Sequence, residues 1–232
     1  MVTCPLCLKT FSKLKTNSHV LPRWALSEIK TNGKNYLITP NGSKKNQKDF
    51  IADLVCEDCE KGFAVDDAVA AAVIRDQASL EKNYLDNDTG IEIHNAKYAL
   101  GFIKFSLGIL LRSHFYKKVI NEGNLLGPYL NKVRMMYLGE EKHCKILICR
   151  DSTIKICSLP QVQKFGHCTT QEYALLGFRI AHFLKEKEHL GAHFEQVWVN
   201  ESQLNIMIDN QKNSHWHRGL AARVQGRRTP KA

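Results

Sequence analysis

The spacing of apolar residues along the chain predicts two long helices. Residues 53–74 carry valines at four-residue intervals beside an alanine-rich stretch, which is the period of a helix that buries one face. Residues 96–120 hold a longer apolar run that becomes basic at its end. We expect this run to form a mostly buried helix whose terminal lysines complement the helix dipole. The segment from Gly123 to Pro128 should end it.

Short strands are expected around the first of these helices. Val20 to Ile38 holds β-prone pieces broken at Asn32-Gly33, and Pro40 to Ser43 has the residues of a turn or loop. Residues 83–90 are polar and acidic, which favours a connection. The region before the long apolar helix is therefore expected to mix short strands with one helix.

The region after the two helices is rich in β-forming residues. Lys145–Cys149 and Thr153–Cys157 are apolar runs that flank a short polar segment, a pattern that predicts a hairpin. Residues 174–183 and 197–199 are expected to add strands, whereas residues 204–208 fit either a strand or a helix. The chain as a whole is therefore expected to be an α+β protein.

Length and composition permit a sizeable core. With 232 residues, of which 44% are hydrophobic, the chain suits one large or two small domains, and wholesale disorder is excluded. We expect an N-terminal module over residues 1–80, an α+β domain of unassigned role over residues 91–212, and a basic C-terminal tail over residues 213–232.

Charge is unevenly distributed along the chain. The formal net charge is +10, which favours polyanionic partners such as nucleic acid. Residues 1–50 hold nine Lys and Arg against two Asp and Glu, whereas residues 51–90 hold three against ten. The tail holds five basic residues and no acidic residue, and is expected to be either a solubilising terminus or a phosphate contact.

The chain shows neither a membrane span nor a secretory signal. No apolar run reaches the ~18 residues that a transmembrane helix needs. The first residues lack a basic region followed by an apolar one, so we expect a cytoplasmic protein with no membrane partner. In that location the eight cysteines are better interpreted as thiols or metal ligands than as disulfides.

Four of the cysteines form two C-x2-C pairs. Cys4 and Cys7 make the first pair, and Cys56 and Cys59 make the second after 48 intervening residues. A pair at this spacing can turn back so that both sulfurs face one ion, and two pairs complete the tetrahedral four-sulfur shell that zinc prefers. Four thiolates leave no open position, so this Zn2+ would be structural.

An imidazole and two carboxylates lie close to the cysteine pairs in the sequence. His19 follows the first pair in a basic, strand-forming stretch. Glu60 follows the second pair directly, and Asp67 lies seven residues further, on the same face of the expected helix. Such a constellation suits metal-assisted hydrolysis, in which the imidazole activates water while the carboxylates hold a divalent ion.

The order C-x2-C, then S-H-V-x-P, then C-x2-C-E resembles the treble-clef, ββα-metal module of HNH endonucleases, over roughly residues 1–75. The resemblance implies a zinc-bound ββα module in which His19 is the general base and Glu60 binds a catalytic Mg2+ or Mn2+. Beside the resemblance, Asp67 and Asp53 are further candidate ligands of that ion. The resemblance also implies hydrolysis of a phosphodiester in DNA, with RNA as the alternative. The structural zinc ligands would be Cys4, Cys7, Cys56 and Cys59.

Two other interpretations stay open. In the first, the module is one of the treble-clef proteins that bind nucleic acid, a protein partner or a second copy of the chain without catalysis. Ser18, where many HNH members have a metal-binding Asp, favours this interpretation. Alternatively, zinc only fixes the N-terminus of a protein whose site lies in residues 96–232, where no chemical motif is recognisable.

Overall fold

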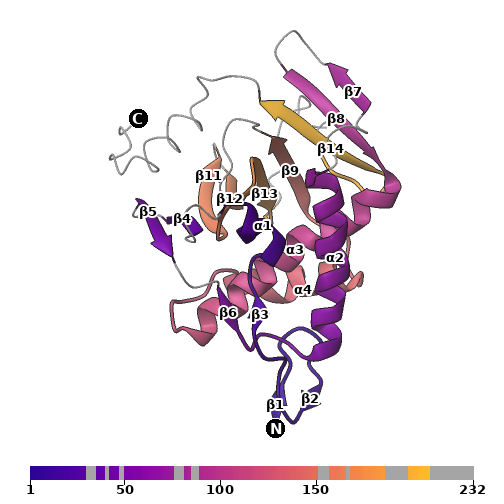
Figure 1. Cartoon of the computed structure of the whole chain (residues 1–232). Coiled ribbons are helices and arrows are strands. Elements are labelled where there is room, and N and C mark those ends of the chain that lie inside the picture. The colour runs from indigo at the N-terminus through magenta and orange to yellow at the C-terminus, as the bar shows by residue number, and fades with distance from the viewer. Residues whose placement is uncertain are drawn as a thin grey trace.

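The computed structural model describes residues 1–29, 35–39, 42–46, 50–75, 81–84, 89–150, 157–165, 168–185 and 198–209. Within these residues the protein is a mixture of helices and a large sheet, so the expected α+β class is confirmed (Figure 1). None of the described helices is both long and apolar enough to cross a membrane.

The N-terminal elements are short and held together by pairing. Strands β1 (Val2–Thr3) and β2 (Thr10–Phe11) form one antiparallel hairpin, and β3 (Ser18–His19) pairs antiparallel with β6 (Ile51–Ala52). Helix α1 (Arg23–Glu28) follows β3, and helix α2 (Glu57–Arg75) follows β6. The first hairpin lies beside the start of α2, at the bottom of Figure 1.

The remaining described strands form one ten-stranded sheet. Its order is β5-β4-β10-β12-β13-β9-β14-β8-β7, with β11 paired to β12. Most neighbours are antiparallel, whereas β10 runs parallel to β4 and β9 parallel to β14. The strands span β4 (Asn35–Thr39), β5 (Gly42–Asn46), β7 (Glu81–Tyr84), β8 (Thr89–Asn95), β9 (Lys145–Arg150), β10 (Cys157–Ser158), β11 (Gln161–Phe165), β12 (Cys168–Leu175), β13 (Phe178–Phe183) and β14 (Gln203–Asp209).

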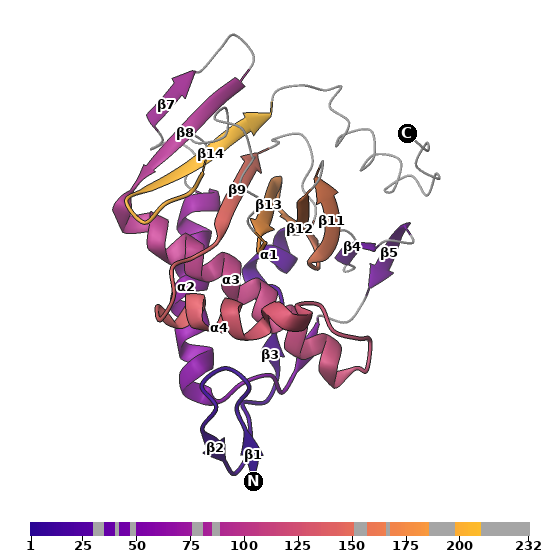
Figure 2. The ribbon, with the colours of Figure 1, turned by 180° about the vertical axis from the view of Figure 1, so that it is seen from behind.

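Helix α3 (Ala96–Val119) is the centre of the packing. It contacts α2 closely enough that a Cβ on Gly101 would lie 2.8 Å from the Val69 side chain. It also contacts the sheet, where Ser106 lies 3.1 Å from the Nε2 of His182 on β13. Helix α4 (Leu130–Leu138), after the 3-10 turn η1 (Gly127–Tyr129), packs on α3 as well (Figure 2). These neighbours explain why the helix is apolar on nearly every side.

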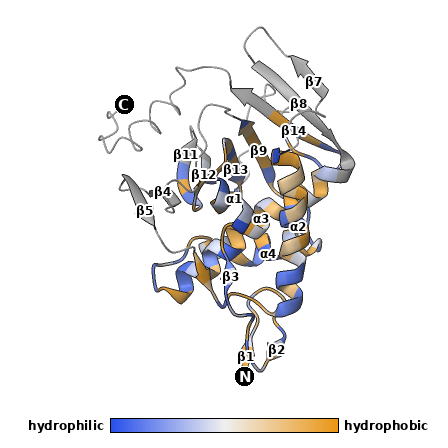
Figure 3. Ribbon diagram, in the orientation of Figure 1, coloured by the Kyte–Doolittle hydropathy of each residue, from blue (hydrophilic) through white to orange (hydrophobic). Residues whose placement is uncertain are grey.

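One continuous core joins the N-terminal module to the sheet. Buried side chains of the first hairpin, of α2, of α3 and of strands β9, β13 and β14 belong to a single apolar cluster. The first turn of α2 is hydrophilic and lies at the end of the helix next to the first hairpin (Figure 3). A buried core therefore supports this end of α2 while its polar turn reaches the surface.

The structure confirms the two long helices that the apolar periodicity predicts, and their ends are close to those expected. Two predictions of strand structure were wrong. Arg23–Glu28 is a helix, because Pro22 begins it and Ala25 and Leu26 are buried. The expected hairpin after Lys145–Cys149 does not form, because β9 lies between β13 and β14 and Cys157 pairs with β12 and β4; residues 153–156 of that run lie outside the described residues. The strands expected over residues 174–183 are confirmed, with Leu176 and Gly177, at φ of 51° and 92°, forming the tight turn between β12 and β13.

The remaining predictions concern a polar segment, a segment of ambiguous type and residues that the structure does not describe. Residues 83–90 do not form a simple connection, because Glu81–Tyr84 and the start of β8 pair at the edge of the sheet. Residues 204–208 lie in strand β14. The Asn32-Gly33 break and the whole basic tail lie outside the described residues.

Helices α2 and α4 are joined by a buried hydrogen bond, which the hydroxyl of Tyr137 donates to Asp66 over 2.9 Å. Burial raises the pKa of Asp66 to about 6, although Tyr137 and Lys104 act to lower it. A carboxyl whose folded pKa exceeds its unfolded value of 3.8 contributes its full stability below about pH 4. That contribution is lost as the pH rises through about 6.

We therefore expect Asp66→Asn, which keeps an acceptor oxygen but removes the charge, to gain stability relative to wild type as the pH rises. The gain between pH 4 and pH 7.5 should be on the order of 1–2 kcal/mol, allowing for screening. Chemical denaturation of both proteins at both pH values measures it, and the buried His114 and His182 cancel in the comparison. A difference in unfolding free energy between the two proteins that does not change with pH would contradict the raised pKa of Asp66.

Candidate metal centre and adjoining site

The four cysteines of the two C-x2-C pairs, here called the cysteine cluster, come together in space. Their Sγ atoms all lie within 4.8 Å of one another, so they are close enough to hold a metal ion. Cys4 and Cys59 are 3.9 Å apart at their sulfurs, and Cys7 and Cys56 are 3.8 Å apart. Zinc with bonds of about 2.3 Å to four sulfurs at tetrahedral angles requires sulfur–sulfur separations of about 3.8 Å. The cluster has the dimensions of a four-thiolate zinc site.

Backbone hydrogen bonds set up both cysteine pairs. The amide of Leu8 donates to the carbonyl of Cys4 at 2.9 Å, and the amide of Cys4 donates to Lys9 at 2.9 Å, which turns the chain between β1 and β2. Leu8 has a φ of 60°, a left-handed conformation that a tight turn imposes. The amide of Cys56 lies 3.4 Å from the Sγ of Cys4, so the second pair meets the first directly.

The electrostatics of the cluster suit a cation. Cys4 and Cys56 are buried, and Cys7 and Cys59 are half-buried. Burial and the neighbouring thiols raise the pKa of the Cys59 thiol, whereas backbone hydrogen bonds lower that of Cys4 against the effect of burial. Several thiolates this close repel one another unless a cation lies between them. Among the described residues this is the one group of cysteine, histidine and acidic side chains with metal-binding geometry.

The predicted imidazole lies on β3, which pairs with β6. His19 pairs with Ile51 across the two strands, and the next amide, that of Val20, donates to Phe50 at 2.9 Å. The His19 side chain is half-buried, and its ring forms no hydrogen bond with a described residue. The backbone of His19 is therefore fixed by the pairing of β3 with β6 and by the hydrogen bond of the next amide.

Glu60 lies in the first turn of α2, directly after the cysteine cluster. Its amide donates to the carbonyl of Cys56 at 3.0 Å. Its Oε2 atom is buried and accepts no hydrogen bond from the part of the chain that the structure describes. A buried carboxylate oxygen usually has a partner, so an unpartnered one is a candidate cation ligand.

Asp67 forms an ion pair with a side chain of the protein, Arg112. Both of its oxygens accept hydrogen bonds from Arg112 on α3, at 2.9 and 2.6 Å. The guanidinium is almost completely buried and lies 4.8 Å from the centre of the Phe63 ring. A divalent ion at Asp67 would have to displace this arginine, whereas Glu60 offers a free oxygen.

Two other acidic or polar neighbours have structural partners. Asp53 accepts a hydrogen bond from the amide of Asn17 at 3.2 Å. The buried hydroxyl of Ser18 lies 3.5 Å from the carbonyl of Lys15. Both contacts hold the segment before His19 in place.

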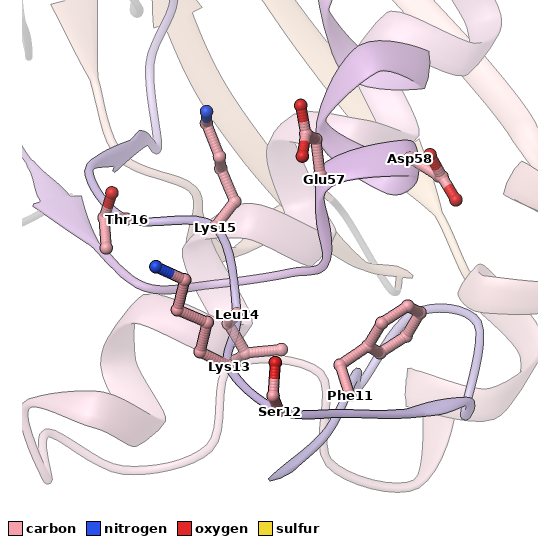
Figure 4. A pocket seen from close by; sticks show the side chains of 8 residues that line it. All are labelled: Phe11, Ser12, Lys13, Leu14, Lys15, Thr16, Glu57 and Asp58. Atoms are coloured by element: carbon pink, nitrogen blue, oxygen red, sulfur yellow. The ribbon is translucent and has the colours of Figure 1, made fainter. Parts of the chain in front are cut away.

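A groove of about 420 Å³ lies beside the cysteine cluster, between residues 11–16 and the first turn of α2. Figure 4 shows the ammonium groups of Lys13 and Lys15 on the same side of the groove as Thr16, with the Phe11 ring at the other side. Glu57 and Asp58 complete the lining, so the groove carries charges of both signs. It offers cations and an aromatic surface close to the strand that bears His19.

Arg112 was missed in the sequence, although a signal was present. It is the one arginine of α3 and directly follows the apolar run Leu107–Leu111, and a buried charge requires a partner. Its partner lies 45 residues earlier on another helix, which spacing alone does not reveal.

Comparison of the chain with protein-family models, with curated proteins and with solved structures gives no match. The functional assignment therefore depends on the geometry of the site and on the sequence pattern.

Proposed function

We propose that the N-terminal module is a zinc-bound treble-clef (ββα) module with metal-dependent endonuclease activity of the HNH type, acting on DNA. The supporting topology is a strand pair followed by a helix, β3 and β6 and then α2, with the cysteine cluster at the start of the helix. The observation that carries the proposal is the buried, unpartnered Oε2 atom of Glu60, in the first turn of the helix that follows the strand pair bearing His19.

In this proposal His19 accepts a proton from the water that attacks the scissile phosphate. Glu60 binds Mg2+ or Mn2+, an ion that needs only one or two carboxylates when phosphate and water supply its other ligands. Such an ion, when bound, stabilises charge on the leaving oxygen. The Zn2+ held by the cysteine cluster has no open position and would serve to fix the first hairpin against the start of α2.

Lysines of the groove supply the expected contact with the nucleic-acid backbone. Lys13 and Lys15 lie on the segment that leads into β3, and the Lys15 carbonyl is in contact with Ser18. A strand held in the groove would therefore pass close to His19. Phosphate contacts of this kind add affinity without sequence selectivity.

The test is nicking of a supercoiled plasmid in Mg2+ or Mn2+ by wild type, Glu60→Gln and Glu122→Gln. We expect Glu60→Gln to lower the nicking rate by about a hundredfold, because it removes the charge that binds the ion. Glu122 is exposed and lies outside the groove lining, so Glu122→Gln should cut at nearly the wild-type rate. Equal rates for all three proteins would contradict the assignment of Glu60.

A second candidate function is nucleic-acid binding without catalysis. Ser18 favours it, because the hydroxyl faces the Lys15 carbonyl where many HNH members have a metal-binding Asp. The same assay distinguishes the two: plasmid binding by zinc-loaded wild type without nicking in either metal supports the binding protein.

A further inference from the structure

The side chain of Arg112 joins three elements at one buried point. Its guanidinium donates to both oxygens of Asp67 on α2, and one nitrogen lies 3.4 Å from the backbone carbonyl of His19 on β3. The arginine itself comes from α3, outside the segment that resembles HNH endonucleases. The strand that carries the proposed base is thus connected to the helix that carries Glu60 through a residue of a third element.

The surroundings of Arg112 make this connection rigid. The Arg112 side chain is 2% exposed, and the guanidinium lies over the ring of Phe63, which is also buried. Burial works to lower the pKa of Arg112, but the charges of Asp67 and Glu60 outweigh it and raise the pKa. The guanidinium is therefore always charged, and its planar fork matches the carboxylate of Asp67 in two parallel hydrogen bonds.

We infer that Arg112 is a positioning residue for the proposed nuclease site, holding the His19 strand at a fixed place relative to α2 and hence to Glu60. The contacts of Arg112 with Asp67 and with the His19 carbonyl are here called the clamp. The catalytic consequence of the clamp rests on the proposed function, whereas the clamp itself does not. It makes α3 a necessary part of the site, so residues 1–75 would not reach full activity without the following helix. Asp67 then acts as the anchor of Arg112 and not as a metal ligand.

The test removes both charges together, because one charge left buried alone would unfold the protein for an unrelated reason. Asp67→Leu/Arg112→Met replaces the pair with apolar side chains of similar length. Glu172→Leu/Arg179→Met is the matched control, since Arg179 makes two hydrogen bonds of 2.9 and 2.6 Å to Glu172 within the sheet. Arg112→Lys is a third variant that keeps the charge but loses the fork.

Two readouts separate positioning from general stability. Hydrogen exchange should show the Val20 amide, which bonds to Phe50, exchanging at least about tenfold faster in Asp67→Leu/Arg112→Met. The Lys15 amide, which bonds to Val55 beside the cysteine cluster, should keep its protection. In plasmid nicking we expect kcat to fall about tenfold or more with KM unchanged, with partial recovery in Arg112→Lys.

The control pair should alter neither readout. Unchanged protection of Val20 would overturn the clamp, and so would loss of protection at Val20 and Lys15 together. Wild-type kcat in Asp67→Leu/Arg112→Met would overturn its role in positioning. If wild type does not nick DNA, the proposed function fails while the exchange measurement still decides whether Arg112 holds the strand.

Discussion

Cys56→Ser is expected to abolish zinc binding and to unfold the N-terminal module. Cys56 is buried, its sulfur lies 3.8 Å from that of Cys7, and its amide contacts the Sγ of Cys4. One substitution thus removes one ligand and disturbs both cysteine pairs. Structural zinc contributes about 10–16 kcal/mol of folding free energy in small modules, so loss of one of four ligands should cost about 3 kcal/mol or more.

Zinc content per chain and the hydrogen exchange of the N-terminal amides measure this effect. We expect one zinc per chain in wild type and none in Cys56→Ser, with loss of protection at Cys4 and Lys15. Cys144→Ser is the matched control, because Cys144 is also buried but lies outside the cluster. A Cys56→Ser protein that keeps its zinc and its N-terminal protection would show that the four sulfurs are not a metal site.

His19→Ala is expected to abolish cutting without unfolding the protein. His19 is held in the β3–β6 pair by its backbone, which pairs with Ile51. Its ring forms no hydrogen bond with a described residue. Loss of a general base usually costs a factor of about 10²–10⁴ in rate. Removal of a half-buried side chain with no polar partner should change the melting temperature by only a few degrees.

Single-turnover nicking rates and thermal denaturation of the two proteins measure these expectations together. The comparison with Cys56→Ser is the critical one. If His19→Ala destabilised the protein as strongly as Cys56→Ser, the imidazole would be structural, and its assignment as a base would be wrong.

The sequence is sufficient to predict the cysteine cluster and the long helices, because both are encoded locally. Two cysteines separated by two residues form a turn on their own, and a period of about four residues defines the buried face of a helix. The same reasoning places Glu60 in the first turn of α2, directly after the cluster, as the structure has it. These features need no knowledge of distant contacts.

The sheet and the clamp are not predictable in the same way. Strand β10 pairs with β4, more than a hundred residues earlier, and nothing in either short segment identifies the other. Helix α1 has six residues, too few for a period to be visible. The engagement of Asp67 by Arg112 likewise depends on how α2 crosses α3, where Gly101 permits a close approach to Val69.

The most direct test of the account is chemical rescue of His19→Ala by imidazole in the plasmid-nicking assay. Zinc-loaded wild type and His19→Ala are compared in Mn2+, each with and without added imidazole. The account predicts that wild type nicks the plasmid, that His19→Ala does not, and that imidazole restores nicking to His19→Ala alone. Nicking by His19→Ala at the wild-type rate without imidazole would contradict it.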